Sequence, residues 1–222
     1  MKALVVGNGE PPSRELFDTL MVAKLDMVIC ADGGADTVRA FGVEPDAVVG
    51  DLDSASEEVL QHTGAARRVR IDADNTGTDL NKALSHAVSL GVTEAVLTGV
   101  TGRRIDHCLW NLSLLKTFAD RLDLHIVDDW QSIWLLRMGR TATVHAAVGQ
   151  LISLVPLDGP VRGVRTEGLR WPLDGEDLVP GQRDGVSNQM QATPASVCVD
   201  GAGDLLVVVQ ARAGDGAWVE TG

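Results

Sequence analysis

Long apolar runs are missing from this sequence. No stretch approaches the length that a membrane-spanning helix needs, and the apolar run in the opening segment, MKALVVGNG, is too short for a signal peptide. Cysteine is also scarce: Cys30, Cys108 and Cys198 lie far apart, in a spacing that matches neither a zinc site nor a disulfide framework. Together these absences favour a reducing compartment, and we expect a cytosolic protein.

Positive charge is in short supply as well. The 222 residues include 19 lysines and arginines against 31 aspartates and glutamates, which gives a net charge of −12 at pH 7. Because the basic residues form no long run, we expect neither a nucleic-acid surface nor binding to an anionic membrane. An acidic protein that handles a polyanion usually places a divalent cation between its carboxylates and the substrate.

Two common nucleotide-binding motifs are also absent. The sequence contains no Walker A motif, which excludes a P-loop protein, and GNGEPPS does not match the dinucleotide fingerprint G-x-G-x-x-G. There is no internal repeat and no low-complexity linker, so any two domains are expected to pack closely.

The first 140 residues alternate short apolar runs with helical patterns. Ser13 is the expected N-cap of the first helix, and Ser54 with Glu57 forms a predicted capping box for the second. Because strands that alternate with helices pair in parallel, we predict an α/β domain at residues 1–140, with a mostly parallel sheet and helices on both faces. The strands are expected within 2–9, 26–36, 47–54, 67–72, 94–102 and 124–130, and the helices within 13–25, 54–60, 78–90 and 104–122.

The pattern changes near residue 140. The remaining segments are short, rich in β-formers and separated by glycine, proline and aspartate, and no long helical pattern occurs among them. This composition predicts an all-β sandwich domain at residues 141–222. Its strands are expected at 141–148, 150–157, 161–166, 195–200 and 204–211.

Charged residues gather where the predicted strands of the first domain end. Asp51 and Asp53 follow an apolar pair, and if the extended geometry continued, both carboxylates would face the same side. The other strand-end residues are Asp32, Asp79, Arg104 and Asp106. Because open α/β sheets bind ligands at the carboxyl ends of their strands, we expect these residues to converge on one site. Carboxylate oxygens at that edge suggest Mg²⁺-dependent handling of phosphate.

Each cluster also has a purely structural interpretation. Asp53 and Ser54 could cap the next helix, Asp79 could cap the helix that it begins, and the neighbouring glycines could serve only tight turns. His107 has no second histidine at ligand spacing, which favours a hydrogen-bonded structural residue over a metal ligand. What favours a site is that all the clusters share the same position at strand ends.

In their order along the chain, these motifs resemble those of the thiamine pyrophosphokinase family. The first half carries GNGEPPS, ADGGAD, GDLDS, DNTGTDLNKAL and GVTGRRIDH, and the second half carries LISLVPL, GVRTEGLRWPL and GVSN. Each motif alone is weak, but the ordered set spans nearly the whole chain. In GDLDS, Leu52 stands where the family usually has phenylalanine, and its side chain is expected to point away from the acids.

The resemblance implies transfer of diphosphate from ATP to the hydroxyl of thiamine, with release of AMP. It implies a homodimer, with ATP bound by the α/β domain and thiamine by the sandwich. Mg²⁺ would be bound by Asp51, Asp53 and Asp79, whereas ATP phosphates would be contacted by Asn75, Lys82 and Arg104. Asp32 and Asp106 are both candidates to orient the thiamine hydroxyl or accept its proton, and the choice between them stays open.

The thiamine end of the site is expected in the second domain. The resemblance implies that Trp171 stacks on thiamine and that Ser187 and Asn188 form hydrogen bonds with the aminopyrimidine. Without the family resemblance, a tryptophan in a β domain would be expected to pack in the core. That structural role is expected for the other four, which are Trp110, Trp130, Trp134 and Trp218.

Two other kinds of function share parts of this pattern. One is a different Mg²⁺-dependent pyrophosphokinase or phosphohydrolase that acts on another alcohol or a nucleotide. The other is a non-catalytic protein that binds thiamine or a nucleotide, which would be expected to lack a metal carboxylate. All the candidate carboxylates are present here.

Overall fold

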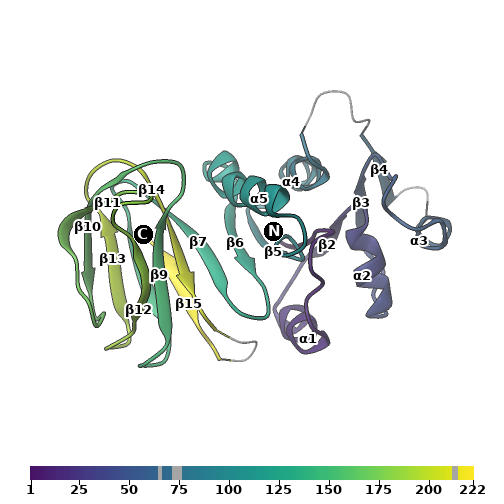
Figure 1. Cartoon of the computed structure of the whole chain (residues 1–222). Coiled ribbons are helices and arrows are strands. Elements are labelled where there is room, and N and C mark those ends of the chain that lie inside the picture. The colour runs from purple at the N-terminus through teal and green to yellow at the C-terminus, as the bar shows by residue number, and fades with distance from the viewer. Residues whose placement is uncertain (65–66, 72–76, 212–214) are drawn as a thin grey trace. The chain divides into compact units, whose positions relative to one another are not determined.

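The chain consists of two compact units in a computed structural model that describes residues 1–64, 67–71, 77–211 and 215–222. The first unit comprises Met1–Asp128 and the second comprises Asp129–Gly222 (Figure 1). The division therefore falls before residue 140. The reason is that β7 (Ser132–Arg137) pairs along its length with β14 (Asp204–Val209), so it belongs to the second unit.

The first unit is an α/β structure in which helices follow the strands in turn. The described strands lie in the spatial order β6-β5-β1-β2-β3-β4, and every neighbouring pair is parallel. The strands are β1 (Lys2–Val6), β2 (Met27–Ala31), β3 (Ala47–Gly50), β4 (Arg68–Arg70), β5 (Glu94–Thr98) and β6 (Asp123–Val127). The helices are α1 (Arg14–Val22), α2 (Gly34–Ala40), α3 (Glu57–His62), α4 (Asp79–Ser89) and α5 (Ile105–Phe118).

The strand order reverses between β1 and β5. From β1 the chain steps through β2 and β3 to β4, and then returns to the other side of β1 to form β5 and β6. Because parallel connections are right-handed, this reversal places the helices on opposite faces of the sheet. Figure 1 shows α1 and α2 on one face and α4 and α5 on the other. This reversal lies at the carboxyl ends of β1 and β5, the position at which open α/β sheets bind ligands.

Local sequence accounts for the helix ends that border this edge. Ser13 caps α1 as predicted, since its hydroxyl accepts a hydrogen bond from the Leu16 amide at 3.1 Å. Thr78 caps α4 in the same way. The predicted capping box at Ser54 is wrong: α3 begins later, and its N-cap is Ser56, whose hydroxyl accepts from the Val59 amide at 3.3 Å.

The sheet of the first unit is buried where it is central. All four residues from Ala3 to Val6 in β1 are fully buried, as expected for a parallel strand covered on both faces. On one face, Leu4 and Val6 pack with Phe17 of α1 and with Ala35 and Val38 of α2. This packing fixes the strand ends from which the polar loops emerge.

The second unit is a sandwich of antiparallel sheets. One sheet has the order β12-β9-β14-β7 and the other has the order β11-β10-β13-β8-β15. Side chains from both sheets form one buried cluster, which includes Leu154 and Val207 from the first sheet and Val164 and Val197 from the second. The remaining strands are β8 (Thr141–His145), β9 (Leu151–Pro156), β10 (Val161–Glu167), β11 (Asp174–Leu178), β12 (Gly185–Gln189), β13 (Ala195–Val199) and β15 (Trp218–Thr221).

The expectation that four tryptophans serve the core is correct only for Trp134, which is 7% exposed. Trp110 is 50% exposed because it lies beside, not on, the buried stripe of α5, which contains Asn111 and Leu114. Trp130 precedes β7 and is also exposed. Trp218 is on the edge strand β15, where its ring stacks on His145 at a centroid distance of 3.8 Å.

Among the described residues, no helix combines the length and the apolar character that crossing a membrane requires.

Candidate active site

A cavity of about 390 Å³ lies in the first unit at the carboxyl ends of β1 and β5. It is lined by residues of the loops after β1, β2, β3 and β5 and by the N-terminal halves of α4 and α5. Asp32, Asp79 and Arg104, which sequence reasoning expected to converge, all line it. The cavity coincides with the reversal of strand order, the position at which open α/β sheets bind ligands.

Glycines allow the loops after β1 and β5 to approach each other closely. A Cβ atom at Gly7 would lie 2.7 Å from the Gly99 carbonyl oxygen, and one at Gly9 would lie 2.5 Å from the Thr101 carbonyl oxygen. Both distances are shorter than any real Cβ contact. The two loops are also joined directly, because the Gly9 amide donates to the Gly99 carbonyl at 2.6 Å. Main-chain groups therefore form this side of the cavity.

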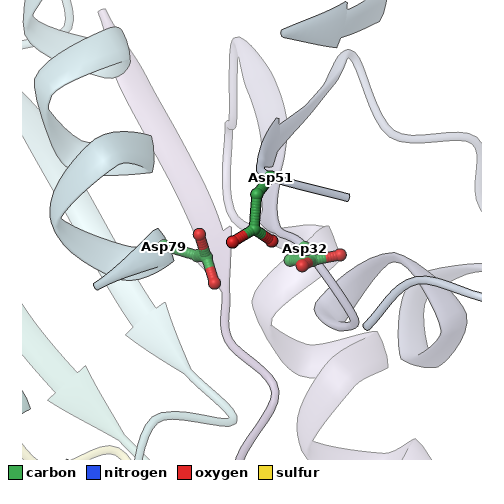
Figure 2. A group of neighbouring side chains, drawn as sticks. All are labelled: Asp32, Asp51 and Asp79. Atoms are coloured by element: carbon green, nitrogen blue, oxygen red, sulfur yellow. The ribbon is translucent and has the colours of Figure 1, made fainter. Parts of the chain in front are cut away.

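Three carboxylates from three different elements meet beside the cavity. Asp32 follows β2, Asp51 follows β3 and Asp79 begins α4, and each offers an oxygen within 4.8 Å of the others. Figure 2 shows the carboxylate of Asp51 between those of Asp79 and Asp32. These are hard oxygen donors, and their chemistry and spacing fit a divalent cation such as Mg²⁺. We call Asp32, Asp51 and Asp79 the acid cluster.

Asp53 lies outside the acid cluster, although the sequence suggested that it would share a side with Asp51. The strand ends at Gly50, and Leu52 adopts a left-handed conformation with φ 64°, so extended geometry does not continue through the loop. The Asp53 carboxylate is exposed and accepts a hydrogen bond from the Ser54 hydroxyl at 2.9 Å. Leu52 packs against the core, consistent with a side chain directed away from the acids.

Asp32 is the most constrained member of the acid cluster. It is 1% exposed, and its backbone has φ 43°, a conformation that residues other than glycine rarely adopt. Its two oxygens accept hydrogen bonds from the amides of Ala55 at 2.8 Å and Ser54 at 3.2 Å. Burial raises the pKa of the Asp32 carboxyl, and the negative charges of Asp79 and Asp51 act in the same direction.

Lys82 contacts a carboxylate of the acid cluster. The sequence predicted a phosphate contact, but the side chain is 3% exposed and its Nζ donates to Asp79 Oδ1 at 2.8 Å. Lys82 is thus engaged with Asp79, and its predicted contact with the ATP phosphates stays a prediction. Asn75, the other residue expected at the phosphates, lies outside the described residues.

Arg104 and Asp106 form an exposed ion pair at the start of α5. Arg104 Nε donates to Asp106 Oδ1 at 3.1 Å, and the hydrogen bond from the guanidinium lowers the pKa of Asp106 to about 2. A carboxylate with so low a pKa is a weak base. Arg104 lines the cavity and remains available to an anionic ligand that displaces Asp106.

Sequence reasoning overlooked three residues of the cavity: Asn8, Arg103 and Asn111. Arg103 has φ 53° and reaches the Asn8 carbonyl at 3.4 Å. Asn111 is buried on α5, and its Nδ2 donates to the Val100 carbonyl at 2.8 Å, which ties the β5–α5 loop to the helix. A signal was available for Asn111, because a polar residue on an otherwise apolar helical stripe needs a buried partner.

In the second unit, Trp171 and Ser187 are exposed, whereas Asn188 is 5% exposed. The Asn188 side chain binds the backbone of Trp171 twice, accepting from its amide at 3.1 Å and donating to its carbonyl at 2.7 Å. Asn188 is thus occupied in supporting Trp171. The Arg170 guanidinium lies over the Trp171 ring, 4.8 Å from its centroid.

Two family models match the chain in succession. "Thiamin pyrophosphokinase, catalytic domain" matches residues 19–127, and "Thiamin pyrophosphokinase, vitamin B1 binding domain" matches residues 141–202. The first match contains the acid cluster, and the second contains Trp171 and Asn188.

Curated relatives and solved structures agree with these matches. Thiamine pyrophosphokinase 1 of Oryza sativa subsp. japonica is 28% identical over 237 residues, covering 95% of this chain and 87% of the relative. Thiamine pyrophosphokinase of Bacillus subtilis (strain 168) is 26% identical over 165 residues, covering 73% of this chain and 77% of that protein. The crystal structure of the thiamin pyrophosphokinase from Geobacillus thermodenitrificans aligns with a TM-score of 0.80 at 25% identity, over 97% of this chain and 100% of that one.

The fold extends to more distant relatives. The yeast thiamin pyrophosphokinase structure has a TM-score of 0.80 at 18% identity and covers 96% of this chain and 87% of its own. The two family models together match most of the 222 residues. The chain therefore belongs to the thiamine pyrophosphokinase family.

Proposed function

We propose that this protein transfers diphosphate from ATP to the hydroxyl of thiamine, giving thiamine diphosphate and AMP, at the carboxyl edge of the first unit. The family supplies the reaction. The observation that carries the location is the acid cluster, whose three carboxylates lie within 4.8 Å of one another beside a cavity lined by Arg103 and Arg104. Carboxylates and guanidinium groups at one cavity suit a ligand that carries phosphates and a divalent cation.

In this proposal Mg²⁺ is the divalent cation, and Asp51 and Asp79 are its principal ligands. Asp32 supports the same position from the buried side. Asp53 is exposed two residues from Asp51, and we keep it as an outer ligand that reaches the cation from the solvent side. When bound, the cation would bridge phosphate oxygens and offset the negative charge that develops on the AMP leaving group.

The nucleotide would occupy the cavity at the reversal of strand order. Arg104 and Arg103 would bind its phosphates, with Asn75 as a further predicted contact. Asp32 is a better candidate than Asp106 to orient the thiamine hydroxyl, because burial raises the pKa of Asp32, whereas Arg104 lowers that of Asp106. No covalent intermediate is required, since positioning and charge stabilisation can carry in-line transfer.

Thiamine would be recognised by the second unit. The exposed ring of Trp171 would stack on thiamine, and the exposed Ser187 would form a hydrogen bond with the aminopyrimidine. Asn188 would act mainly by holding the backbone of Trp171.

The proposal also includes a homodimer in the cytosol. Family resemblance suggests that each thiamine is held by the sandwich of one subunit and faces the acids of the other, which a two-fold axis would produce twice. The proposed reducing compartment rests on the scarcity and wide spacing of the three cysteines.

A product assay tests the reaction. The protein is incubated with ATP, Mg²⁺ and thiamine, and the products are separated by chromatography. We expect AMP and thiamine diphosphate in equal amounts, and neither in EDTA. Formation of AMP with free diphosphate in the absence of thiamine would instead indicate a phosphohydrolase, and binding of both substrates without products would indicate a non-catalytic protein. The control for this assay is the variant Asp174→Asn. Asp174 is exposed on β11 and far from the acid cluster in sequence, so its replacement should leave product formation unchanged.

A further inference from the structure

Lys82 is a buried cation in direct contact with the acid cluster. It lies one helical turn after Asp79 on α4, and its Nζ is 2.8 Å from Asp79 Oδ1. Of the lysines and arginines whose burial the structure describes, Lys82 is the one that is buried, with 3% of its side chain exposed. An ammonium group is costly to remove from water unless a negative charge compensates it, so its burial needs the carboxylate.

The charge of Lys82 acts on the whole acid cluster. The Nζ of Lys82 donates to Asp79, whose carboxylate lies beside those of Asp51 and Asp32, so one positive charge faces three negative ones. The lysine offsets part of the repulsion among three carboxylates that lie within 4.8 Å of one another.

The hydrogen bond also divides the two oxygens of Asp79 between two tasks. Lys82 engages Oδ1, which leaves Oδ2 for another cation. The carboxylate of Asp79 is 32% exposed, so it is accessible from the cavity while its lysine partner is not. The orientation of Asp79 is thus set from within the protein before any ligand arrives.

We infer that Lys82 is a positioning residue that serves as the internal counter-ion of the acid cluster, holding Asp79 in place and competing electrostatically with the divalent cation. This inference rests on the proposed metal site. Its consequence is that the protein alone binds a divalent cation weakly. Tight binding then requires the phosphates of ATP as additional ligands, so the cation and the nucleotide bind together.

The test measures cation affinity in the absence of nucleotide. Mn²⁺, which accepts the same oxygen ligands, is titrated into wild type, Lys82→Met and Lys82→Arg, and free Mn²⁺ is followed by electron paramagnetic resonance. We expect Lys82→Met to bind Mn²⁺ about tenfold more tightly than wild type, because a neighbouring positive charge has been removed. Lys82→Arg keeps the charge and should stay within about twofold of wild type. Turnover with ATP and Mg²⁺ should nevertheless fall in Lys82→Met, because Asp79 loses its support.

A purely structural lysine would give a different result, since its loss would leave Mn²⁺ affinity unchanged or weaker, and either outcome overturns the inference. If Lys82→Met does not fold, Lys82→Gln replaces it in the same titration. If wild type binds no Mn²⁺ alone, and Mn²⁺ does not strengthen its binding of ATP, the proposed metal site fails. If wild type binds Mn²⁺ and the neutral variant binds it no more tightly, only the counter-ion role fails.

Thermal unfolding in EDTA supplies a second reading that does not involve metal. Lys82→Met should lower the Tm by about 5–10 °C, because three carboxylates are then left without their cation. The double variant Asp79→Asn/Lys82→Met should recover most of this loss, because it removes both partners of the pair. Additive losses in the double variant would show that Lys82 does not stabilise through Asp79, and would also overturn the inference.

Discussion

The two units of this protein arrange charged side chains in opposite ways. In the second unit, charges are matched in exposed pairs across neighbouring strands, for example Arg165 with Asp200 at 2.7 Å and Arg162 with Asp177. In the first unit, the acid cluster brings three carboxylates together with one buried lysine. Exposed pairs contribute about 0–1 kcal/mol each, whereas like charges held together cost stability.

Backbone conformation follows the same contrast. Asp32, Leu52 and Arg103 adopt positive φ values, and all three lie at the carboxyl edge of the first unit. In the second unit, Ser187, beside the supporting residue Asn188, is the corresponding case among the described residues. Strained backbone and converging charge thus occur together where ligands are proposed to bind. In this protein the pattern of charge, more than its amount, separates the proposed site from a solvated surface.

The strongest test of this contrast removes a carboxylate from the acid cluster. Asp51→Asn and Asp79→Asn should each lower kcat by about a thousandfold or more, because the proposed cation loses a principal ligand. The Tm of Asp51→Asn in EDTA should be equal to or above that of wild type, since a repelling charge has gone. Asp53→Asn, which changes the outer position, should lower kcat by less, about ten- to a hundredfold. Near wild-type turnover in Asp51→Asn would show that the acid cluster is not needed for catalysis.

The thiamine side can be separated from the nucleotide side by Trp171→Ala. We expect the KM for thiamine to rise about 5- to 30-fold, from the loss of stacking worth about 1–2 kcal/mol. The KM for ATP should change by less than about twofold. Trp218→Ala is the matched control, because that ring is also partly exposed in the second unit but stacks on His145. Equal rises in both constants would instead make Trp171 a structural residue.

Mixing two damaged variants tests whether the units of different subunits cooperate. Asp51→Asn and Trp171→Ala are combined at equal concentration, under conditions that permit subunit exchange, and assayed at low thiamine. Random pairing makes half of the dimers mixed, with one intact site in two, so activity should return to about a quarter of wild type. If each subunit builds its own site, mixing restores nothing. Sedimentation as a monomer at the assay concentration would exclude the shared site directly.

The smallest effect is expected for the ion pairs of the second unit. Asp174→Asn removes one exposed partner of Arg165 and should shift the Tm by less than about 3 °C, with kcat unchanged. Differential scanning calorimetry at low and high salt measures this, and added salt should reduce the difference further. A large decrease in Tm that does not depend on salt would mean that the paired charges of the second unit stabilise it by more than exposed ion pairs do.

The carboxyl edge could be predicted from sequence because it depends on element order. Apolar runs followed by acids identify strand ends, and parallel connectivity gathers those ends on one edge, where Asp32, Asp51 and Asp79 meet. The position of Asp53 could not be predicted, because it depends on the left-handed conformation of Leu52, for which a lone leucine carries no sequence signal. Periodicity placed Lys82 on the same helical face as Asp79 but could not show that this face was buried.

Tertiary context decided the remaining differences. The exposure of Trp110 depends on which stripe of α5 faces the sheet, and that of Trp218 depends on its place in an edge strand. Asn188 was predicted to contact thiamine, and its bonds to the Trp171 backbone arise from an approach of residues 17 positions apart. Interactions between distant segments of this kind leave no pattern within either segment.

The contact between the loops after β1 and β5 has a consequence for how this site can vary. Gly7, Gly9 and Gly99 bring main chain against main chain, so this side of the cavity has its shape because side chains are missing. Substitutions there would act by enlarging the separation of the loops, whatever the chemistry of the new residue. If the cavity holds a nucleotide as proposed, variation in nucleotide preference is expected from lining residues that carry side chains, such as Arg103, His107 and Asn111, which can be exchanged one at a time.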